Sequence, residues 1–324
     1  METLKIFSDS GLDGVAGKLL RDGISPHELI EPKTRLTSVL AKPEPDPSFG
    51  LADIAFGQPD LESIRNSKNL KWLQVSSAGI TRYDTAEFRA LAAERGLIVT
   101  NSSSVYSTAC AEHALAFMMA QSRLIPAALA SHAANGDAEW LGLRGGSVSL
   151  QGQNVVILGF GTIARELMRL LEPFAMKITA MRRTPRGDEG CDVVTPENLA
   201  SALATADHVV NILPENEESL GYINAARLAA MKPGAVFHNI GRGTTVNQDD
   251  LLEALRSGHL AAAWLDVTDP EPLPADHPLR HEPRCFITPH IAGGHRGESE
   301  TLVRHFLKNF RKFTAGEPLD DRVM

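Results

Sequence analysis

The chain has 324 residues, a length that predicts more than one hydrophobic core, so we expect two domains. Its apolar content of 43% and charged content of 22% are typical of globular proteins and exclude an intrinsically disordered chain. The net charge of −8 argues against nucleic acid and anionic membranes as partners and favours a soluble enzyme.

The N-terminal sequence METLKIFSDSGLDG has no basic segment followed by an apolar one, so no secretory signal peptide is expected. The longest apolar stretch, around 114–120, is too short to cross a bilayer. Cys110, Cys191 and Cys285 lack CxxC spacing, and no short-spaced cluster of cysteines and histidines occurs. These features predict a cytoplasmic protein with reduced, buried thiols, no metal and no membrane partner.

The first hundred residues alternate short apolar runs with helical stretches. The runs LKIF, DIAFG, LKWLQVS and LIVT predict strands of a first α/β unit. A proline-rich stretch at 43–48 predicts an extended surface loop. Residues Ser107 to Leu124 predict a long apolar helix that ends before Pro126 and bridges two domains.

The same alternation restarts after Leu150 and is clearer there. Strands are expected at 154–158, 178–181, 208–213, 235–240, 261–267 and 285–288, with helices between most of them. Such a series predicts a parallel, doubly wound sheet. The amphipathic tail from Glu298 to Phe313 is expected to form a helix that packs on the first unit.

The stretch GFGTIA at 159–164 follows a predicted strand and opens a predicted helix. This is the GxGxxA form of the dinucleotide fingerprint. Gly159 permits a tight turn, Gly161 lets a pyrophosphate approach the backbone, and Ala164 keeps the helix close to the strand. A plain glycine-rich turn explains the two glycines equally well. The strand, helix and next strand at the required places favour the dinucleotide site.

The end of the next strand predicts which dinucleotide is bound. NAD sites usually carry an acidic residue there, about 20 residues beyond the glycines. This chain instead has TAMRRTPR, with Arg182, Arg183 and Arg186 and no carboxylate before Asp188. Guanidinium groups suit a 2′-phosphate, whereas a carboxylate would repel it. A solvated basic turn is the alternative; we favour NADP, with NAD as the second possibility.

Polar residues follow three successive predicted strand ends in the second half of the chain. Arg242 follows AVFHNIG, Glu271 lies in the turn beyond Asp266, and His290 follows FITP. Ligands of open α/β sheets bind at the carboxyl ends of the strands, so these side chains are expected to converge near the nicotinamide. Pro289 is expected to stiffen the approach to His290.

Reduction of a 2-oxo acid needs a hydride on carbon and a proton on the carbonyl oxygen. A histidine can supply that proton, a neighbouring carboxylate orients the ring, and an arginine can hold the substrate carboxylate and polarise the carbonyl. His290, Glu271 and Arg242 match these three roles. Alone, each has a simpler explanation, as a strand cap, a solvated charge or a phosphate-binding loop residue. Their joint occurrence at three strand ends favours catalysis.

These motifs resemble the D-isomer specific 2-hydroxyacid dehydrogenase family. The segments that carry the resemblance are AEHALA at 111–116, GFGTIA at 159–164, NIGRGTTVNQDDLLEAL at 239–255, LDVTDPEPLP at 265–274 and TPHIAGG at 288–294. The resemblance implies a Rossmann dinucleotide-binding domain at 104–292. It also implies a smaller, flavodoxin-like α/β substrate-binding domain made of 1–103 and 293–324, and a homodimer formed through the cofactor domain.

The resemblance also implies roles for single residues. The family's catalytic arginine, glutamate and histidine carry over to Arg242, Glu271 and His290, and Arg242 also binds substrate. The family's substrate-carboxylate loop matches SSAGITRYD, with the N–H groups of Ser77, Ala78 and Gly79 as donors, where a plain β-turn is the alternative. The expected cofactor contacts are Gly159, Gly161, Thr162, Ile163, Arg182, Arg183, Arg186, Leu213, Pro214, Ile240 and Asp266, the last beside the nicotinamide amide.

Two details of the chain leave local structure open. The segment TNSSSVYSTAC lacks the glycine expected after Asn101, so the contacts of that segment are not predicted. Gly293 and Gly294 are expected to let the chain return to the substrate domain, close to a hinge.

The leading function is therefore an NADP-preferring reductase of a small 2-oxo acid, of the glyoxylate or hydroxypyruvate type. The first alternative is an NAD-dependent dehydrogenase of another D-2-hydroxy acid, which gains if Arg182 and Arg183 point to solvent. A formate or phosphite dehydrogenase is a less favoured alternative. From a different class, a non-catalytic dinucleotide-binding protein of the corepressor kind would keep the fingerprint and lose the catalytic set.

Overall fold

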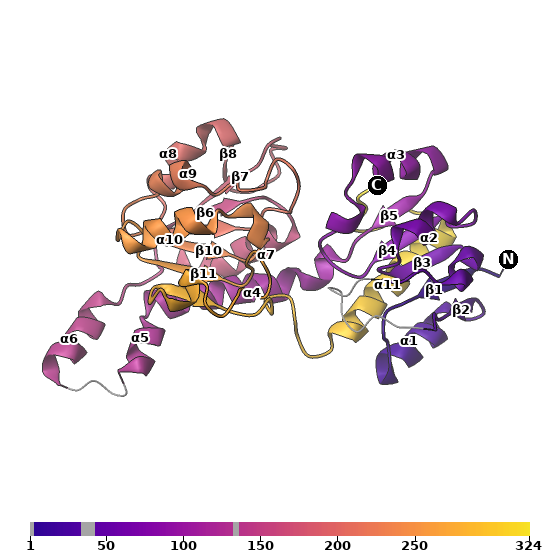
Figure 1. The fold of residues 1–324 in the computed structure, drawn as a ribbon, viewed down its shortest axis with the longest axis horizontal. Coiled ribbons are helices and arrows are strands. Elements are labelled where there is room, and N and C mark those ends of the chain that lie inside the picture. Colours follow the sequence, from indigo (N-terminus) through magenta and orange to yellow (C-terminus); the bar gives the residue numbers. More distant parts are fainter. Residues whose placement is uncertain (1–2, 34–42, 132–135) are drawn as a thin grey trace. The chain divides into compact units, whose positions relative to one another are not determined.

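The computed structural model of the chain describes residues 3–33, 43–131 and 136–324, which form two compact units (Figure 1). Unit 1 consists of Met1–Tyr106 and His295–Met324, and unit 2 of Ser107–Gly294. The boundaries expected from the sequence, at 103/104 and 292/293, lie slightly earlier. Helix α4 (Ser103–Ser122) begins in unit 1 and continues in unit 2.

Unit 1 contains a five-stranded parallel sheet in the order β2-β1-β3-β4-β5, the order of flavodoxin-like folds. Its strands are β1 (Lys5–Ser8), β2 (Glu28–Ile30), β3 (Ile54–Gly57), β4 (Trp72–Val75) and β5 (Ile98–Thr100). Its helices are α1 (Gly14–Ile24), α2 (Leu61–Asn66), α3 (Ala86–Arg95) and α11 (Glu298–Ala315). The four apolar runs of the sequence form β1, β3, β4 and β5. The short β2 carries no such run.

The C-terminal helix α11 belongs to the core of unit 1, where Figure 1 shows it in yellow among the indigo and purple N-terminal elements. Phe306 stacks on Phe56 of β3 and on Trp72 of β4, with ring centroids 4.5 and 5.2 Å apart. All three side chains are fully buried. Burying a phenylalanine contributes about 1.5–3 kcal/mol, so the apolar stripe of the tail explains why it returns to this unit.

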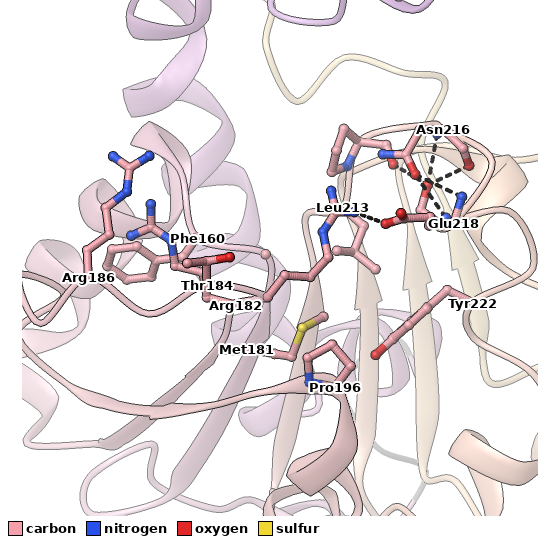
Figure 2. A pocket seen from close by; sticks show the side chains of 14 residues that line it. Phe160, Met181, Arg182, Thr184, Arg186, Pro196, Leu213, Asn216, Glu218 and Tyr222 are labelled. Atoms are coloured by element: carbon pink, nitrogen blue, oxygen red, sulfur yellow. Dashed lines mark hydrogen bonds and ion pairs between the residues drawn. The ribbon is translucent and has the colours of Figure 1, made fainter. Parts of the chain in front are cut away.

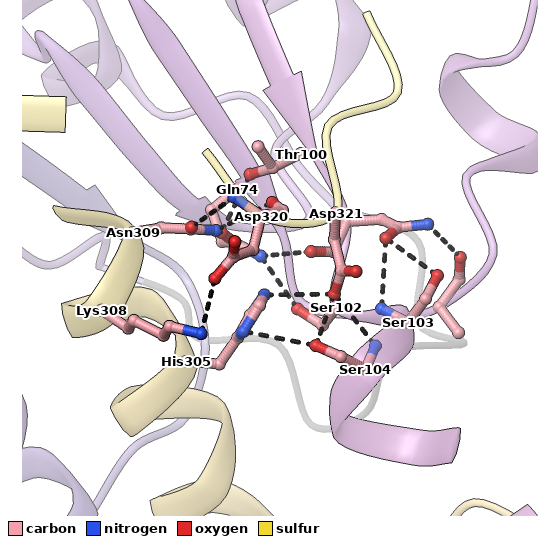
Figure 3. A network of polar contacts seen from close by, with 12 residues as sticks. Gln74, Thr100, Ser102, Ser103, Ser104, His305, Lys308, Asn309, Asp320 and Asp321 are labelled. Carbon is pink, nitrogen blue, oxygen red and sulfur yellow. Dashed lines mark hydrogen bonds and ion pairs between the residues drawn. The ribbon is translucent and has the colours of Figure 1, made fainter. Parts of the chain in front are cut away.

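Polar side chains fix the chain end to unit 1 (Figure 3). Asn309 of α11 donates to Gln74 Oε1 at 3.0 Å. Asp321 Oδ2 accepts from the backbone N–H and the hydroxyl of Ser104 at 2.9 and 2.6 Å, and thereby caps the first turn of α4. This helix consequently begins earlier than the predicted start at Ser107. Asn101 Oδ1 also accepts from the Ser103 N–H at 3.1 Å, so a local cap acts together with the one from the distant Asp321.

The proline-rich stretch at 43–48 is only partly an extended loop. Residues 43–46 have no regular structure, but Pro47–Leu51 forms a short 3-10 helix. Asp46 caps this helix by accepting from the Ser48 N–H at 2.8 Å. Proline suits the first position of a helix because its missing N–H would have no partner there. The prediction of an extended loop is therefore wrong at its C-terminal end.

Unit 2 contains a seven-stranded parallel sheet in the order β12-β11-β10-β9-β6-β7-β8. Its strands are β6 (Asn154–Leu158), β7 (Lys177–Met181), β8 (Asp192–Val194), β9 (His208–Asn211), β10 (Val236–Asn239), β11 (Ala262–Leu265) and β12 (Cys285–Ile287). The six predicted strands are confirmed, most of them with ends shifted by one or two residues. The strand β8 was missed because it is short and only half-buried.

The strand order of unit 2 is that of a Rossmann fold with one added edge strand, β12. The direction of winding reverses between β6 and β9, so the carboxyl ends of these two strands form the switch point where such sheets bind ligands. The helices are α5 (Ile125–Ala130), α6 (Asp137–Gly146), α7 (Thr162–Leu171), α8 (Leu199–Leu203), α9 (Ala225–Ala229) and α10 (Gln248–Arg256). Within the described ranges, no helix has the length and apolar character needed to cross a bilayer.

Two histidines lie inside the sheet of unit 2. His208 Nδ1 is 3.0 Å from His238 Nε2, and both side chains are buried. Burial lowers the pKa of His208 to about 4, although Asp207 opposes the shift. Burial, followed by the neighbouring His208, holds the pKa of His238 well below its usual value. Both rings are therefore neutral at pH 7, and one donates the proton that the other accepts.

We expect unit 2 to lose stability as the pH falls below about 6.5. The unfolded chain binds protons on these imidazoles near that pH, whereas the folded unit resists protonation down to about pH 4. The free energy of unfolding therefore decreases as the pH falls through this window. His208 alone accounts for about 3 kcal/mol by the end of the window. Hydrogen exchange of the β9 and β10 amides, compared at neutral and mildly acidic pH, measures the loss.

The matched control is the double variant His208→Gln, His238→Phe, which lacks both imidazoles. It should lose less stability than the natural chain over the same pH interval, and an equal loss would exclude the pair as the cause. The comparison has to be made within unit 2. In unit 1, burial raises the pKa of Asp9 to about 6, so that carboxyl makes its unit more stable as the pH falls.

Candidate active site

The glycine-rich turn lies at the carboxyl end of β6. Gly159 has a φ of +97°, and a Cβ there would lie 3.2 Å from the carbonyl oxygen of Ile212, so the turn requires glycine. Gly161 directly precedes α7, and a Cβ on it would meet no atom within 4 Å. That space lies at the helix N-terminus, where the first N–H groups, including those of Thr162 and Ile163, lack intrahelical partners. The turn therefore fits a dinucleotide pyrophosphate.

A pocket of about 640 Å³ adjoins this turn (Figure 2). Its volume is in the usual range of ligand pockets. The residues that line it are Gly159, Phe160, Met181, Arg182, Arg183, Thr184, Arg186, Pro196, Leu213, Pro214, Asn216, Glu218, Ser219 and Tyr222. The structure thus brings together the three predicted arginines and the predicted contacts Leu213 and Pro214.

The arginine loop is organised by an acidic residue. The buried Glu189 carboxylate accepts from Arg182 Nη1 at 2.9 Å and from the N–H groups of Arg186 and Gly187 at 2.8 Å each. The hydrogen bond from the Arg186 N–H, helped by those from Gly187 and Arg182, lowers the pKa of the Glu189 carboxyl. Asp188 Oδ1 lies 3.8 Å from Arg182 Nη1. Glu189 therefore supports the loop from inside and does not line the pocket.

The other two arginines are exposed. Arg183 forms an ion pair with Glu218 on the facing segment of the pocket. The guanidinium of Arg186 has no hydrogen bond or ion pair within the described residues. The three cations therefore differ in availability, with Arg182 engaged by a buried carboxylate, Arg183 by an exposed one, and Arg186 by none.

The predicted histidine and glutamate meet at the carboxyl edge of the sheet. His290 Nδ1 lies 2.6 Å from Glu271 Oε1, and the two side chains are 31% and 32% exposed. Within the described residues, Nε2 of this ring has no partner. The pair is therefore oriented by one nitrogen and available to a reactant through the other.

Asp266 holds the backbone that carries this histidine. Its carbonyl accepts from the His290 N–H at 2.9 Å, and its carboxylate accepts from the N–H groups of Ile291 and Ala292, also at 2.9 Å. The Thr288 hydroxyl donates to the same carboxylate at 2.6 Å. Three of the approximately four acceptor sites of this buried carboxylate are thus used inside the protein.

The segment expected to turn at Gly293 and Gly294 has its positive φ at a different residue. The positive φ belongs to His290, at +52°, and neither Gly293 nor Gly294 has one. Left-handed backbone at a non-glycine residue persists when surrounding contacts impose it. The hydrogen bonds to Asp266 supply that constraint, so the expected backbone freedom of the two glycines is not what shapes the turn.

A second histidine supports Asp266 from α4. His113 Nε2 lies 3.2 Å from Thr288 Oγ1 and 3.7 Å from Asp266 Oδ1. Burial lowers the pKa of His113, although Asp266 opposes the shift. Because the Thr288 hydroxyl donates to Asp266, its oxygen accepts from His113, which places the ring proton on Nε2. Asp266 and Thr288 thus form an ordered support beneath His290.

The loop that carries Arg242 rests on buried amides. Asn211 Nδ2 donates to Asn239 Oδ1 at 3.0 Å and to Thr245 Oγ1 at 2.7 Å. The Thr245 hydroxyl in turn donates to the carbonyl of Arg242 at 2.6 Å. This network holds the backbone of Arg242 through its carbonyl and makes no contact with the guanidinium.

The guanidinium of Arg242 is not hydrogen-bonded to the His290–Glu271 pair within the described residues. Its Nη1 donates to the carbonyl of Gly241 at 2.6 Å. Ile240, predicted to contact the cofactor, is buried at the end of β10 and does not line the pocket. Arg242 does follow the strand end predicted for it, three residues beyond the last residue of β10, while its guanidinium is bonded to its own loop.

The predicted carboxylate loop follows β4 in unit 1. Its carbonyls are engaged, because the Ser102 N–H donates to Ser77 O at 3.0 Å and Asn101 Nδ2 donates to Ala78 O at 2.8 Å. The N–H groups of Ser77, Ala78 and Gly79 have no hydrogen-bond partner among the described residues. Successive unpaired N–H groups suit an anion. Asn101 therefore orients this loop although no glycine follows it.

The three cysteines are free thiols. Cys110 is buried, but Cys191 and Cys285 are half-buried, so the prediction of buried thiols is wrong for these two. Burial raises the pKa of Cys110 and of Cys285 to about 12. Among the described residues, no group of three or more His, Cys, Asp or Glu side chains is arranged to hold a metal ion.

Comparison with known proteins gives the family. The model of the D-isomer specific 2-hydroxyacid dehydrogenase NAD binding domain matches residues 115–292. The chain belongs to the D-isomer specific 2-hydroxyacid dehydrogenase family. Glyoxylate reductase/hydroxypyruvate reductase of Homo sapiens is 34% identical over 79% of this dehydrogenase and 77% of the human protein. Glyoxylate reductase of Pyrococcus furiosus is 30% identical over 80% of the chain and 77% of that protein.

A solved structure shows the same fold over the whole dehydrogenase. The D-isomer specific 2-hydroxyacid dehydrogenase from Xanthobacter autotrophicus, in complex with NADPH and MES, is 26% identical. The superposition covers 100% of this chain and 98% of the Xanthobacter chain, with a TM-score of 0.79. These findings confirm the predicted family, the α/β fold with its Rossmann domain, and an enzyme that uses a nicotinamide dinucleotide on a 2-hydroxy acid or its 2-oxo form.

Three residues around the candidate site of this dehydrogenase were not predicted from the sequence. Glu189 pairs with Arg182, which lies 7 positions earlier in the sequence, and Glu218 pairs with Arg183, which lies 35 positions earlier. Only folding brings each pair together. His113 stands in the AEHALA motif, but its contact with Thr288 spans 175 positions. Sequence spacing alone carries no signal for contacts of this kind.

Proposed function

We propose that this dehydrogenase reduces a small 2-oxo acid, of the glyoxylate or hydroxypyruvate type, to the D-2-hydroxy acid with NADPH. The observation that carries the proposal is the His290–Glu271 hydrogen bond at the carboxyl edge of the sheet, with Nε2 of the ring free of any partner from the described part of the chain. The names of the human and Pyrococcus relatives support the substrate class.

Each residue of the site has a proposed task in this reaction. NADPH, when bound, supplies the hydride. His290 gives a proton from Nε2 to the carbonyl oxygen, while Glu271 holds Nδ1 and compensates the charge of the imidazolium. Arg242 turns from the Gly241 carbonyl to the substrate carboxylate, which a guanidinium binds bidentately. Asp266 keeps His290 in place and retains acceptor capacity for the nicotinamide amide.

The substrate loop and the cofactor contacts complete the proposal. The N–H groups of Ser77, Ala78 and Gly79 are proposed to bind the substrate carboxylate, which makes unit 1 the substrate-binding domain. Unit 2 is then the dinucleotide-binding domain, with the pyrophosphate on the Gly159–Ile163 turn. A cytoplasmic location belongs to the same proposal.

The cofactor preference rests on the charges of the pocket. Arg183 and Arg186 are exposed at its wall, and the NADPH complex of the Xanthobacter relative supports a 2′-phosphate site. The second candidate is an NAD-dependent dehydrogenase of another D-2-hydroxy acid. It is favoured by the carboxylates of Glu189 and Glu218, which already neutralise two of the three arginines.

Initial rates of NADPH and NADH oxidation with glyoxylate, hydroxypyruvate, pyruvate and phenylpyruvate test this function. We expect NADPH to be oxidised with one of the first two acids. The double variant Arg183→Gln, Arg186→Gln should raise the KM for NADPH about tenfold or more, because charge-assisted hydrogen bonds to the phosphate are lost. The KM for NADH should change little. Turnover with NADH alone, unaffected by the double variant, would contradict the NADP assignment.

We also propose that unit 2 forms a homodimer through α5 and α6. These helices expose large apolar side chains, with Leu129, Trp140 and Leu141 exposed by 70%, 52% and 58%. Exposed apolar patches of this kind mark protein–protein contacts. The double variant Leu129→Asp, Leu141→Asp should sediment as a monomer, while the natural chain sediments as a dimer. A monomeric natural chain at micromolar concentration would exclude this dimer.

A further inference from the structure

We infer that Glu218 is a specificity-determining residue, which weakens the binding of NADPH relative to NADH by competing with the 2′-phosphate for Arg183. The inference rests on the proposed NADP-linked function. Both side chains line the pocket beside the glycine-rich turn, and they form an ion pair with each other. Figure 2 shows Glu218 and Asn216 across the pocket from Thr184 and Arg186.

The three arginines are not equally able to receive a phosphate. Arg182 is only 17% exposed and bonded to Glu189, whose side chain is 2% exposed. Taking Arg182 away would leave a buried carboxylate without its cation, which is costly. Arg183 and Glu218 are 64% and 69% exposed, and an exposed pair of this kind is weak. Arg183 is therefore the paired arginine that a phosphate can take over.

Displacing Glu218 from Arg183 costs free energy, and this cost arises for NADPH but not for NADH. A 2′-phosphate has to displace the Glu218 carboxylate from the guanidinium and then remains near that like charge. The ribose of NADH is neutral at this position and leaves the ion pair intact. A carboxylate near a ribose also suits its hydroxyl groups, which is how NAD sites use acidic residues. Glu218 consequently shifts the selectivity of an arginine-rich pocket towards NADH.

The test compares the dissociation constants of NADPH and NADH, measured by cofactor fluorescence without substrate. In Glu218→Gln, the dissociation constant of NADPH should fall about three- to fivefold, the range expected for releasing an exposed ion pair. That of NADH should change by less than about twofold. The gain should shrink at high ionic strength, because salt screens the competing charge.

The matched control is Glu217→Gln, which removes the same charge from the adjacent exposed residue, outside the pocket lining. It should leave both dissociation constants as in the natural chain. An equal gain in NADPH affinity in this control would overturn the inference, since the effect would then be one of net charge. The melting temperature of each variant establishes that it is folded.

Two further outcomes distinguish a failure of the inference about Glu218 from a failure of the proposed NADP-linked function. If Glu218→Gln leaves NADPH binding unchanged while Arg183→Gln weakens it, Glu218 is not a competitor and the NADP function stands. If the natural chain binds NADH better and Arg183→Gln changes neither constant, the proposed cofactor is wrong and the inference falls with it. Binding of 2′,5′-ADP, which carries the phosphate without the nicotinamide, reports directly on the phosphate contact in each variant.

Discussion

Replacing His290 with asparagine should lower kcat for reduction of the 2-oxo acid by about 10²–10⁴, the usual contribution of a positioned proton donor. Asparagine is the informative substitute because it tolerates the left-handed backbone found here, at a φ of +52°, better than alanine does. It also keeps a polar group for Glu271 to bond. Steady-state kinetics with saturating cofactor measure the loss.

Cofactor binding should survive in this variant, because His290 does not line the pocket beside the glycine-rich turn. Titration with NADPH checks that point independently of turnover. The matched control is His281→Asn, an exposed histidine in the 3-10 helix Pro278–His281, which should retain full activity. Normal turnover of His290→Asn would remove His290 from the proton-donating role.

Replacing Arg242 with glutamine should lower kcat/KM for the 2-oxo acid by about 10²–10³, as when an electrostatic contact to the reacting group is lost. Arg242→Lys should recover only a small part, since an ammonium cannot make the bidentate contact of a guanidinium. The fold should be unaffected, because the buried network of Asn211, Asn239 and Thr245 holds the backbone of this loop and not the side chain.

Kinetics with varied substrate and the melting temperature together test this expectation for Arg242. The control is Arg256→Gln at the end of α10, which removes the same charge from a helix terminus distant in the fold. A variant of Arg242 that melts normally and keeps the natural kcat/KM would exclude the guanidinium from binding the substrate in the reaction.

Several features followed directly from local sequence. The turn at Gly159 was predictable because its positive φ excludes a side chain, so the residue type records the backbone conformation. All strands except the short β2 and β8 were predictable, because buried parallel strands have sequences that are short apolar runs. The meeting of His290 and Glu271 was predictable because parallel strands end at one edge, which brings together residues that follow different strands.

Other features depended on partners far away in the sequence. Asp321 contributes to the cap at the start of α4, and Glu189 and Glu218 decide which arginines are available. The position of His290 depends on Asp266, whose carboxylate collects the N–H groups of the following turn. None of these contacts has a characteristic sequence spacing from which it could be predicted.

The sequence by itself determined the class of fold, the dinucleotide fingerprint and the residue types at the strand ends, because turn conformation and hydrophobic period act over a few residues. Only the tertiary structure decided the state of the charges. Whether Arg182, Arg183 and Arg186 are paired or available, and whether His208 and His238 are neutral, depends on burial and on neighbours brought together by folding. Electrostatic interactions depend on distance and solvent exposure, and neither is a property of the local sequence.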